Sequence, residues 1–480
     1  MTNTTPADKP PSTEVSSIFD IRSIHDIYAE IQDLYLSDHR PWIIGYSGGK
    51  DSTTVVQLVW NAIKAVTPEQ QTKPIYVISS DTLVETPIII DTINKNLDLI
   101  NIAAQEQKLP IRSFKLYPKI KDTFWVLLIG KGYPTPSQSF RWCTERLKIR
   151  TADTFILNKA SEHGEVILVL GIRKSESSAR AQLMNLYKIK GSLLSRHSKF
   201  AQSFIYTPIE DFSKDDIWTY LLQNPSPWGG NNRDLLALYK SADSGECPLV
   251  VDEYSPPCGN SRFGCWTCTL VTEDKAIKGL IDSGEEWLEP LLEYRNMLAE
   301  TQEKEKKPIF RDYKRMDGKI KFKRDGSGEL IRGPYKLEYC KQFLKELLEA
   351  QRKIQENGPN PNLLLIRPEE LHEIRRIWRQ EKGDWEDSVP KIYRQVMGTD
   401  LDWVQDDLGS FSEQERELLD EMCKKHDVPI RLVTKLLDLE HQTQGMRRRA
   451  AVYSRIEDVL SEEWRSEEEI TQQKWCCILR

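Results

Sequence analysis

A glycine-containing hexapeptide, Ser47-Gly-Gly-Lys-Asp-Ser52, constrains the fold of this chain more than any other feature. It follows an apolar run, residues 41–46, and precedes a segment with the apolar spacing of a helix, residues 53–60. This order predicts a strand, a turn at Gly48 and Gly49, and the start of a helix. Several backbone N–H groups and the positive end of the helix dipole would then converge on one point, which suits a polyphosphate.

The residues of this loop supply different groups for a bound nucleotide. The glycines let the backbone approach an anion closely, Lys50 adds positive charge, and the hydroxyl groups of Ser47 and Ser52 can donate hydrogen bonds. An acid beside a phosphate is unfavourable unless it holds a cation, so we interpret Asp51 as a Mg²⁺ ligand or as a residue of the first helical turn. An ordinary glycine turn followed by a helix cap is the alternative.

With 480 residues, the chain is long enough for two or three domains. We expect residues 1–20 to be a disordered tail and residues 21–222, where β-rich runs alternate with helical stretches, to form an α/β nucleotide-binding domain. We expect residues 223–272 to form a cysteine-rich loop region and the charged residues 273–480 to be mainly helical. No signal sequence and no apolar run of about 20 residues is seen, which predicts a cytoplasmic protein without a membrane partner.

Four strands and five helices are predicted in the α/β domain. The strands are residues 42–46, 75–79, 112–116 and 166–170, and the helices are residues 24–35, 53–65, 85–107, 120–129 and 145–159. Ligands of an open parallel sheet bind beyond the carboxyl ends of its strands. The glycine loop, Asp81 and Gly171 all follow such ends, so we expect them at one edge of the sheet.

Two further segments carry groups suited to a nucleotide. The second strand is followed by Asp81 and Glu85, which either contact the nucleotide or belong to a strand end and a first helical turn. The fourth strand is followed by residues 171–180, whose three cations include Arg173 and Arg180. Cations are costly inside a core, so they predict an anion-filled cleft. A solvated surface loop is the alternative.

The nine cysteines are an odd number and accompany no export signal, which favours thiols or metal ligands over disulfides. Cys247, Cys258, Cys265 and Cys268 lie in a Gly/Pro-rich stretch with one C-x-x-C pair and can present four sulfurs to one centre. Zinc and an iron–sulfur cluster both accept such a set. Cys143 lies at a predicted helix start among basic residues, which favours a nucleophile or a metal ligand over a buried structural cysteine.

These motifs resemble those of known families. The hexapeptide resembles the loop of the ATP pyrophosphatase (PP-loop) superfamily, and the order of the motifs is that of PAPS-reductase-like proteins. The resemblance implies an adenine nucleotide alpha hydrolase-like parallel sheet with flanking helices, and ATP with Mg²⁺ as ligands. It implies catalytic roles for Lys50, Asp51, Cys143, Arg173 and Arg180. It implies nucleotide contacts from Ser47, Gly48, Gly49, Lys50, Asp51, Ser52, Asp81, Gly171 and Arg173.

A more specific resemblance concerns the cysteine-rich region and the long charged C-terminal region. Together with the other motifs they are similar to the DndC family, the PAPS-reductase-like component of the bacterial DNA phosphorothioation (Dnd) system. The resemblance implies an ATP pyrophosphatase and sulfurtransferase with a [4Fe–4S] cluster. It would act with a cysteine desulfurase and other Dnd proteins to place sulfur on a DNA phosphate, meeting the DNA directly or through a partner. Cys143 would carry a persulfide or ligate the cluster.

Other functions are compatible with the sequence. They are a sulfonucleotide reductase, a tRNA thiolase and a nucleotide-binding regulatory module with structural zinc. The Glu-Cys-Gly-x-His motif of sulfate-reducing enzymes is missing, since Glu246-Cys247 is followed by Pro248. Residues 304–324 hold ten Lys and Arg against three acids, and either contact DNA or form a solvated hairpin. The net charge of −6 gives no general attraction to nucleic acid.

Overall fold

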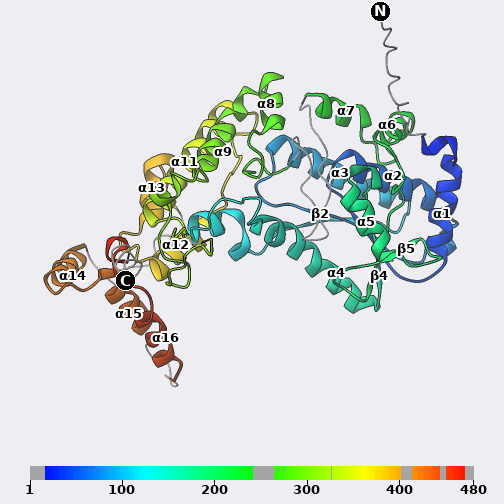
Figure 1. Ribbon diagram of the computed structural model, residues 1–480. Coiled ribbons are helices and arrows are strands. Elements are labelled where there is room, and N and C mark those ends of the chain that lie inside the picture. Colours follow the sequence, from blue (N-terminus) through cyan, green and yellow to red (C-terminus); the bar gives the residue numbers. More distant parts are fainter. Residues whose placement is uncertain (1–16, 242–263, 326, 402–412, 444–449, 471–480) are drawn as a thin grey trace, which may run out of the picture. The chain divides into compact units, whose positions relative to one another are not determined.

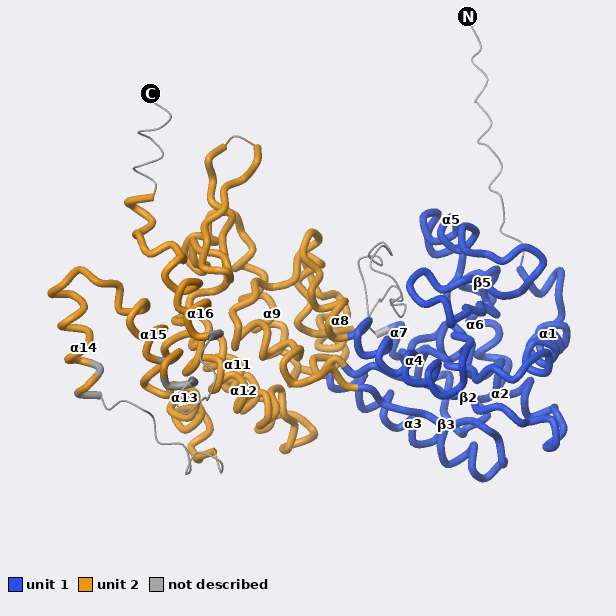
Figure 2. The backbone as a smooth tube through the Cα atoms, turned by 90° about the horizontal axis from the view of Figure 1, so that it is seen from below, with its two compact units in different colours: residues 1–81, 87–116, 148–263 blue, residues 82–86, 117–147, 264–480 orange. Residues whose placement is uncertain are grey.

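The computed structural model describes residues 17–241, 264–325, 327–401, 413–443 and 450–470 (Figure 1). The chain divides into two compact units, each assembled from separate stretches of sequence (Figure 2). Unit 1 comprises residues 1–81, 87–116 and 148–263, and unit 2 comprises residues 82–86, 117–147 and 264–480. The glycine loop therefore belongs to unit 1, whereas Cys143, Cys265 and Cys268 belong to unit 2.

Unit 1 is built on a six-stranded sheet with the strand order β3-β2-β1-β4-β6-β5. The strands are β1 Trp42–Gly45, β2 Ile75–Ser80, β3 Ile111–Leu116, β4 Val166–Val169, β5 Leu194–Arg196 and β6 Ser203–Tyr206. All neighbouring strands run parallel except β5, which is antiparallel to β6. The predicted α/β class and the four predicted strands are confirmed. Strands β5 and β6 were not predicted, because they are short and partly polar.

The sheet is covered by helices on both faces (Figure 1). The helices of unit 1 are α1 Ile24–Leu36, α2 Lys50–Lys64, α3 Pro87–Glu106, α4 Arg150–His163, α5 Ser178–Tyr187, α6 Lys214–Gln223 and α7 Asn232–Ser241. Successive strand residues point to opposite faces. Trp42 and Ile44 pack with α1, α2 and α3, while Ile43 packs with Ile156 and Ala160 of α4. Burial on both faces explains why every residue of β1 is apolar or glycine.

The parallel register aligns the carboxyl ends of the central strands. Gly45 of β1 pairs with Ile78 of β2, and Ile44 pairs with Val169 of β4. The residues that directly follow these strands therefore share one edge of the sheet. The glycine loop, Asp81 and Gly171 lie at this edge, as the sequence predicts.

Unit 2 is mainly helical. Its helices are α8 Lys275–Asp282, α9 Glu289–Glu300, α10 Lys307–Phe310, α11 Leu337–Asn357, α12 Pro368–Glu381, α13 Ser388–Met397, α14 Glu413–Lys425, α15 Ile430–Thr443 and α16 Ala450–Leu460. The apolar side of α11 is buried through residues such as Phe343, Leu344 and Leu347. In the described part of the chain, no helix is both long enough and apolar enough to span a membrane.

Two predicted helices differ from the structure in detail. Residues 120–129 form a short 3₁₀ turn, Ile120–Asp122, and a buried π-helix, Val126–Gly130, because Thr123 between them adopts an extended backbone conformation. Residues 145–159 begin within a second π-helix, Thr144–Ile149, which leads into α4. Such wide turns are uncommon and have no simple sequence signal.

Candidate functional site

The loop between β1 and α2 depends on glycine at its first turn. Gly48 has a φ of +74°, and a Cβ atom added there would lie 2.6 Å from Cγ1 of Ile93. Gly49 is the N-cap of α2 and supplies no side-chain cap. The first-turn N–H groups of α2 are therefore not covered by a side chain from the cap residue. This is the backbone arrangement in which helix N-termini receive anions.

The hydroxyl groups of the loop bond to the loop itself. The Ser47 N–H donates to Oγ of Ser52 over 3.2 Å, and the two hydroxyl oxygens are also 3.2 Å apart. Ser52 donates to the carbonyl of Gly49 over 3.0 Å. Burial raises the pKa of the preceding Tyr46 to about 12 despite an opposing hydrogen bond with Thr53. The loop is thus preorganised next to a phenol that stays neutral at physiological pH.

The charged residues of the loop form a compact network with a distant arginine. Nζ of Lys50 lies 2.7 Å from one carboxylate oxygen of Asp51, and Nε of Arg173 lies 2.6 Å from the other. The side chains of Lys50 and Arg173 are 0% and 2% exposed, and that of Asp51 is 13% exposed. Asp51 therefore holds two buried cations at the start of α2. The sequence did not predict this pairing.

The network continues into α5. Glu176 lies 3.9 Å from Arg173 and forms an ion pair with Arg180 one helical turn later. Ser177 caps α5 by accepting the backbone N–H of Arg180 over 3.1 Å. Three cations and two carboxylates thus alternate from Lys50 to Arg180, and we call these five residues the charge row. The charge row holds one more positive charge than negative charges.

The other predicted residues of unit 1 also have defined surroundings. A Cβ atom on Gly171 would lie 3.0 Å from the backbone carbonyl of Asp51, so glycine allows the two loops to approach closely. Asp81 is 5% exposed and pairs with Lys115 over 2.8 Å. Lys174 contacts Glu210 and Asp211, at 3.1 and 2.8 Å, and so has a role apart from the row of charges.

Aromatic packing fixes the segment around Cys143 in unit 2. Trp142 is buried, stacks on Phe124 with 5.3 Å between ring centroids, and donates to the carbonyl of Pro134. Cys143 itself is half-buried at the start of a helical segment, as predicted. The neighbouring Arg146 lies 2.7 Å from Asp122. Arg146 is one of the basic residues that the sequence places around the Cys143 thiol, but its carboxylate partner was not predicted.

Cys265, one of the four predicted metal ligands, lies in a segment that pairs with residues 82–86. Glu85 and Cys265 form an antiparallel bridge, and the Trp266 N–H donates to the carbonyl of Val84 over 3.0 Å. Sγ of Cys265 lies 3.2 Å from Oγ1 of Thr82 and 3.7 Å from Oε1 of Glu85. Glu85 and Thr82 are therefore neighbours of a candidate ligand, a relationship that the local sequence did not reveal.

A tight turn joins Cys265 to Cys268, whose N–H donates to the carbonyl of Cys265 over 3.0 Å. The turn is followed by a buried arginine contact. Arg295 is 1% exposed and donates to the carbonyls of Cys268 and Thr272, each over 3.0 Å, and also to that of Val271. One guanidinium group therefore fixes the backbone after the C-x-x-C pair. A lone arginine in a charged helical region gave no signal of this role.

Cys247 and Cys258 lie outside the described residues. Within the described ranges, no group of three or more His, Cys, Asp and Glu side chains is arranged to hold a metal ion. The four-cysteine site therefore stays a prediction, of which the structure describes two members, Cys265 and Cys268.

Residues 41–271 match the phosphoadenosine phosphosulfate (PAPS) reductase domain family. The matched segment begins one residue before β1 and ends after Cys268, so it includes the glycine loop, Arg173, Cys143 and the four cysteines of the predicted metal set. Residues 414–461 match a second family, described as a small protein found in certain Dnd DNA modification systems.

Similar individual proteins cover parts of the chain. An uncharacterized protein of Methanocaldococcus jannaschii is 26% identical over 198 residues, which are 41% of this chain. The match spans 35% of that relative, about a third of its length. The solved PAPS reductase of Candida auris, a phosphate complex, is 15% identical, covers 48% of this chain and 90% of its own, and has a TM-score of 0.28.

The U34-tRNA thiolase NcsA of Methanococcus maripaludis, solved with its [4Fe–4S] cluster, is 12% identical. It covers 58% of this chain and 80% of its own, with a TM-score of 0.28. The strand order and the parallel pairing of unit 1 themselves define its α/β class.

Proposed function

We propose that this protein uses ATP to activate a DNA backbone phosphate for sulfur insertion, as the ATP pyrophosphatase and sulfurtransferase of a Dnd system. The observation that carries the proposal is the contact of Asp51 with both Lys50 and Arg173 at the glycine loop. This loop lies in the segment that matches the PAPS reductase domain family. The Dnd-associated segment, residues 414–461 of the same chain, supports DNA as the substrate class.

The glycine loop is proposed to bind the phosphates of ATP through backbone N–H groups and Lys50. Asp81, at the neighbouring strand end, would contact another part of the nucleotide. Asp51 fits a Mg²⁺ ligand because its carboxylate is partly exposed and each oxygen keeps a lone pair besides its contact with Lys50 or Arg173. Bound Mg²⁺ would neutralise charge on the phosphates.

The proposed reaction has two displacement steps. A DNA phosphate oxygen attacks the α-phosphorus of ATP, and pyrophosphate leaves. Sulfur then attacks the DNA phosphorus, and AMP leaves. Arg173 and Arg180, whose carboxylate neighbours are Asp51 and Glu176, would stabilise the negative charge that develops.

Cys143 is proposed to deliver the sulfur as a persulfide supplied by a cysteine desulfurase. Its terminal sulfur forms the bond to phosphorus. A second thiol then cleaves the remaining S–S bond, which leaves Cys143 in a disulfide and the phosphorothioate on DNA. The half-buried position of the Cys143 thiol supports this role, because a carrier must be reached by both donor and acceptor.

A [4Fe–4S] cluster is proposed on Cys247, Cys258, Cys265 and Cys268. The tight turn between the last two supports them as paired ligands. Such a cluster supplies electron or sulfur chemistry, whereas zinc on the same set would be a structural clamp. Protein purified without oxygen should be brown if it holds the cluster, and a colourless protein with one zinc per chain would contradict this assignment.

The decisive test compares Lys50→Ala with Lys64→Ala, which removes an exposed lysine from the other end of α2. Lys50→Ala should abolish pyrophosphate release from ATP, and Lys64→Ala should leave it unchanged. Cells that express the wild-type chain with its Dnd partners should contain phosphorothioate dinucleotides in digested DNA, detected by mass spectrometry. Normal pyrophosphate release by Lys50→Ala would contradict the site, and active ATP cleavage without phosphorothioate would contradict the substrate.

A sulfonucleotide reductase is the second candidate, because the family matched by residues 41–271 takes its name from that activity. Sulfite release from PAPS in the presence of thioredoxin would support it. The missing Glu-Cys-Gly-x-His motif argues against it.

A further inference from the structure

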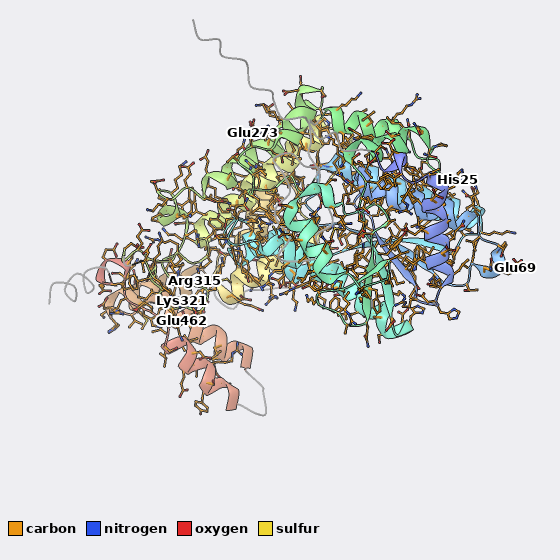
Figure 3. The ribbon with its side chains drawn as sticks, turned by 45° about the vertical axis from the view of Figure 1, so that its right-hand side comes forward. His25, Glu69, Glu273, Arg315, Lys321 and Glu462 are labelled. Atoms are coloured by element: carbon orange, nitrogen blue, oxygen red, sulfur yellow. The ribbon has the colours of Figure 1, made fainter. Side chains whose placement is uncertain are left out.

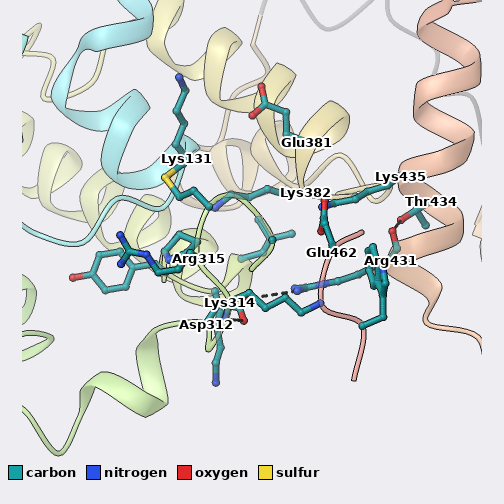
Figure 4. A pocket seen from close by; sticks show the side chains of 18 residues that line it. Lys131, Asp312, Lys314, Arg315, Glu381, Lys382, Arg431, Thr434, Lys435 and Glu462 are labelled. Carbon is teal, nitrogen blue, oxygen red and sulfur yellow. Dashed lines mark hydrogen bonds and ion pairs between the residues drawn. The ribbon is translucent and has the colours of Figure 1, made fainter. Parts of the chain in front are cut away.

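A basic cavity lies within unit 2, apart from the residues assigned above. Its volume is about 180 Å³. It is lined by the loop around residues 312–318, by residues 334–337, by the end of α12, by α15 and by the segment after α16 (Figure 4). Arg315 and Glu462, which line it, are also labelled in Figure 3. Its cations are Lys131, Lys314, Arg315, Lys336, Lys382, Arg431 and Lys435, and its carboxylates are Asp312, Glu381 and Glu462.

Each carboxylate of the cavity already has a cationic partner. Asp312 lies 3.4 Å from Arg431, and Glu462 lies 2.6 Å from Lys435. Glu381 lies 3.7 Å from an arginine that does not line the cavity. Considering only described residues, the other five cations have no carboxylate within 4.0 Å. These are Lys131, Lys314, Arg315, Lys336 and Lys382.

Three of these cations contact groups other than carboxylates. Lys314 lies over the ring of Trp464, 4.5 Å from its centroid. Arg315 donates to a backbone carbonyl over 3.0 Å, and Lys382 donates to the sulfur of Cys340 over 3.6 Å. Burial lowers the pKa of Lys314, Asp312 and Glu462 oppose this shift, and Arg431 and Lys435 add to it to a smaller extent. A bound anion would relieve this electrostatic cost.

The cavity joins the basic stretch, residues 304–324, to the Dnd-associated end of the chain. Within the matched segment, α15 contributes Arg431 and Lys435. Just after it, the Glu463 N–H donates to the carbonyl of Gly318 over 3.1 Å, and the Tyr313 hydroxyl donates to that of Arg465 over 2.7 Å. An anion held here would contact both segments at once.

We propose that this cavity binds a phosphate group, either inorganic phosphate or a phosphate of a nucleic-acid backbone. Seven cations line the cavity against three carboxylates, and this excess favours a ligand with a high density of negative charge over a single carboxylate. Lysines predominate, and they act as adaptable point charges rather than as rigid bidentate forks. The site is separate from the glycine loop of unit 1 and does not depend on the proposed reaction.

The experiment uses the full chain with Lys50→Ala, so that phosphate at the glycine loop does not contribute. The cavity variant is Lys314→Ala with Lys336→Ala. The matched control is Lys278→Ala with Lys353→Ala, which removes two exposed lysines from outside both the cavity and residues 304–324. Binding of inorganic phosphate is measured by thermal shift against chloride at equal ionic strength. Binding of a labelled DNA duplex is measured by fluorescence anisotropy.

The cavity variant should lose about tenfold or more in phosphate affinity, while the control pair keeps it. Weaker binding of both probes means that the cavity accepts phosphate from either source. Weaker binding of DNA alone identifies the nucleic-acid backbone as the source. The proposal is wrong if phosphate raises the melting temperature no more than chloride does and if the cavity and control variants bind DNA with equal affinity. Lys336→Gln alone, checked by circular dichroism, provides the same comparison if the double variant does not fold.

Discussion

The carboxylate of Asp51 lies 2.6 Å from Nε of Arg173, although the two residues are 122 positions apart in the chain. The contact connects the loop after β1 with the loop after β4, and these strands are neighbours in the sheet. Lys50 occupies the other oxygen of the same carboxylate. A single carboxylate, that of Asp51, therefore contacts two buried cations.

Asp51→Asn should destabilise unit 1 by about 3–5 kcal/mol, because Lys50 and Arg173 would keep buried charges without their shared carboxylate. Urea unfolding at neutral pH measures this free energy. Asp215→Asn is the control, since it removes an exposed carboxylate from the first turn of α6. Equal stability of the two variants would show that the carboxylate of Asp51 is not needed to hold the cations.

Gly48→Ala should destabilise the protein by about 1–3 kcal/mol and reduce pyrophosphate release. The added Cβ meets Ile93 at 2.6 Å and also requires a positive φ. Gly164→Ala separates the two causes, because Gly164 has a φ of +85° with nothing within 4 Å of the added atom. Thermal unfolding of both variants gives the comparison. An equal loss would mean that backbone strain alone, without the contact with Ile93, sets the cost.

Arg295→Lys should loosen the backbone after the C-x-x-C pair, because an ammonium group cannot donate in the fixed fork that reaches three carbonyls. We expect faster modification of the Cys268 thiol by iodoacetamide, read by mass spectrometry of metal-free protein. Arg352→Lys is the control, since that arginine is half-exposed and donates to the carbonyl of Val396. An unchanged rate at Cys268 would contradict a positioning role for Arg295.

The outcome at these sites shows which features the local sequence determines. The strands, the glycine loop and its place at the sheet edge were predictable, because apolar runs, glycine turns and helix starts are local patterns. The partner of Asp51 could not be predicted. The sequence favoured a role for Asp51 as a Mg²⁺ ligand or as an acid of the first helical turn, and it could not show that Arg173 would reach the Asp51 carboxylate. The contact between Glu85 and Cys265 likewise arises from two distant segments that pair only in the folded unit.

Asp216 provides a pH-dependent contribution to the stability of unit 1. Its burial opposes ionisation, but hydrogen bonds from Ser17, Ser213 and the Ile18 N–H outweigh burial and lower its pKa below the usual 3.8. A carboxyl group with a lowered folded-state pKa stabilises the fold fully above its unfolded-state value. That contribution is lost as the pH falls through the folded-state value.

Asp216→Asn should therefore be less stable than wild type at pH 7, and the difference should shrink below about pH 3.8 as the wild-type carboxyl group becomes protonated. Urea unfolding of both proteins across the acid range measures the difference in free energy. The amide of asparagine preserves the shape of the side chain but replaces one acceptor oxygen with a donor, so the change of the difference with pH, and not its size at pH 7, reports the charge. A difference that stays constant from pH 7 through the acid range would show that the hydrogen bonds to Asp216 do not depend on its ionisation.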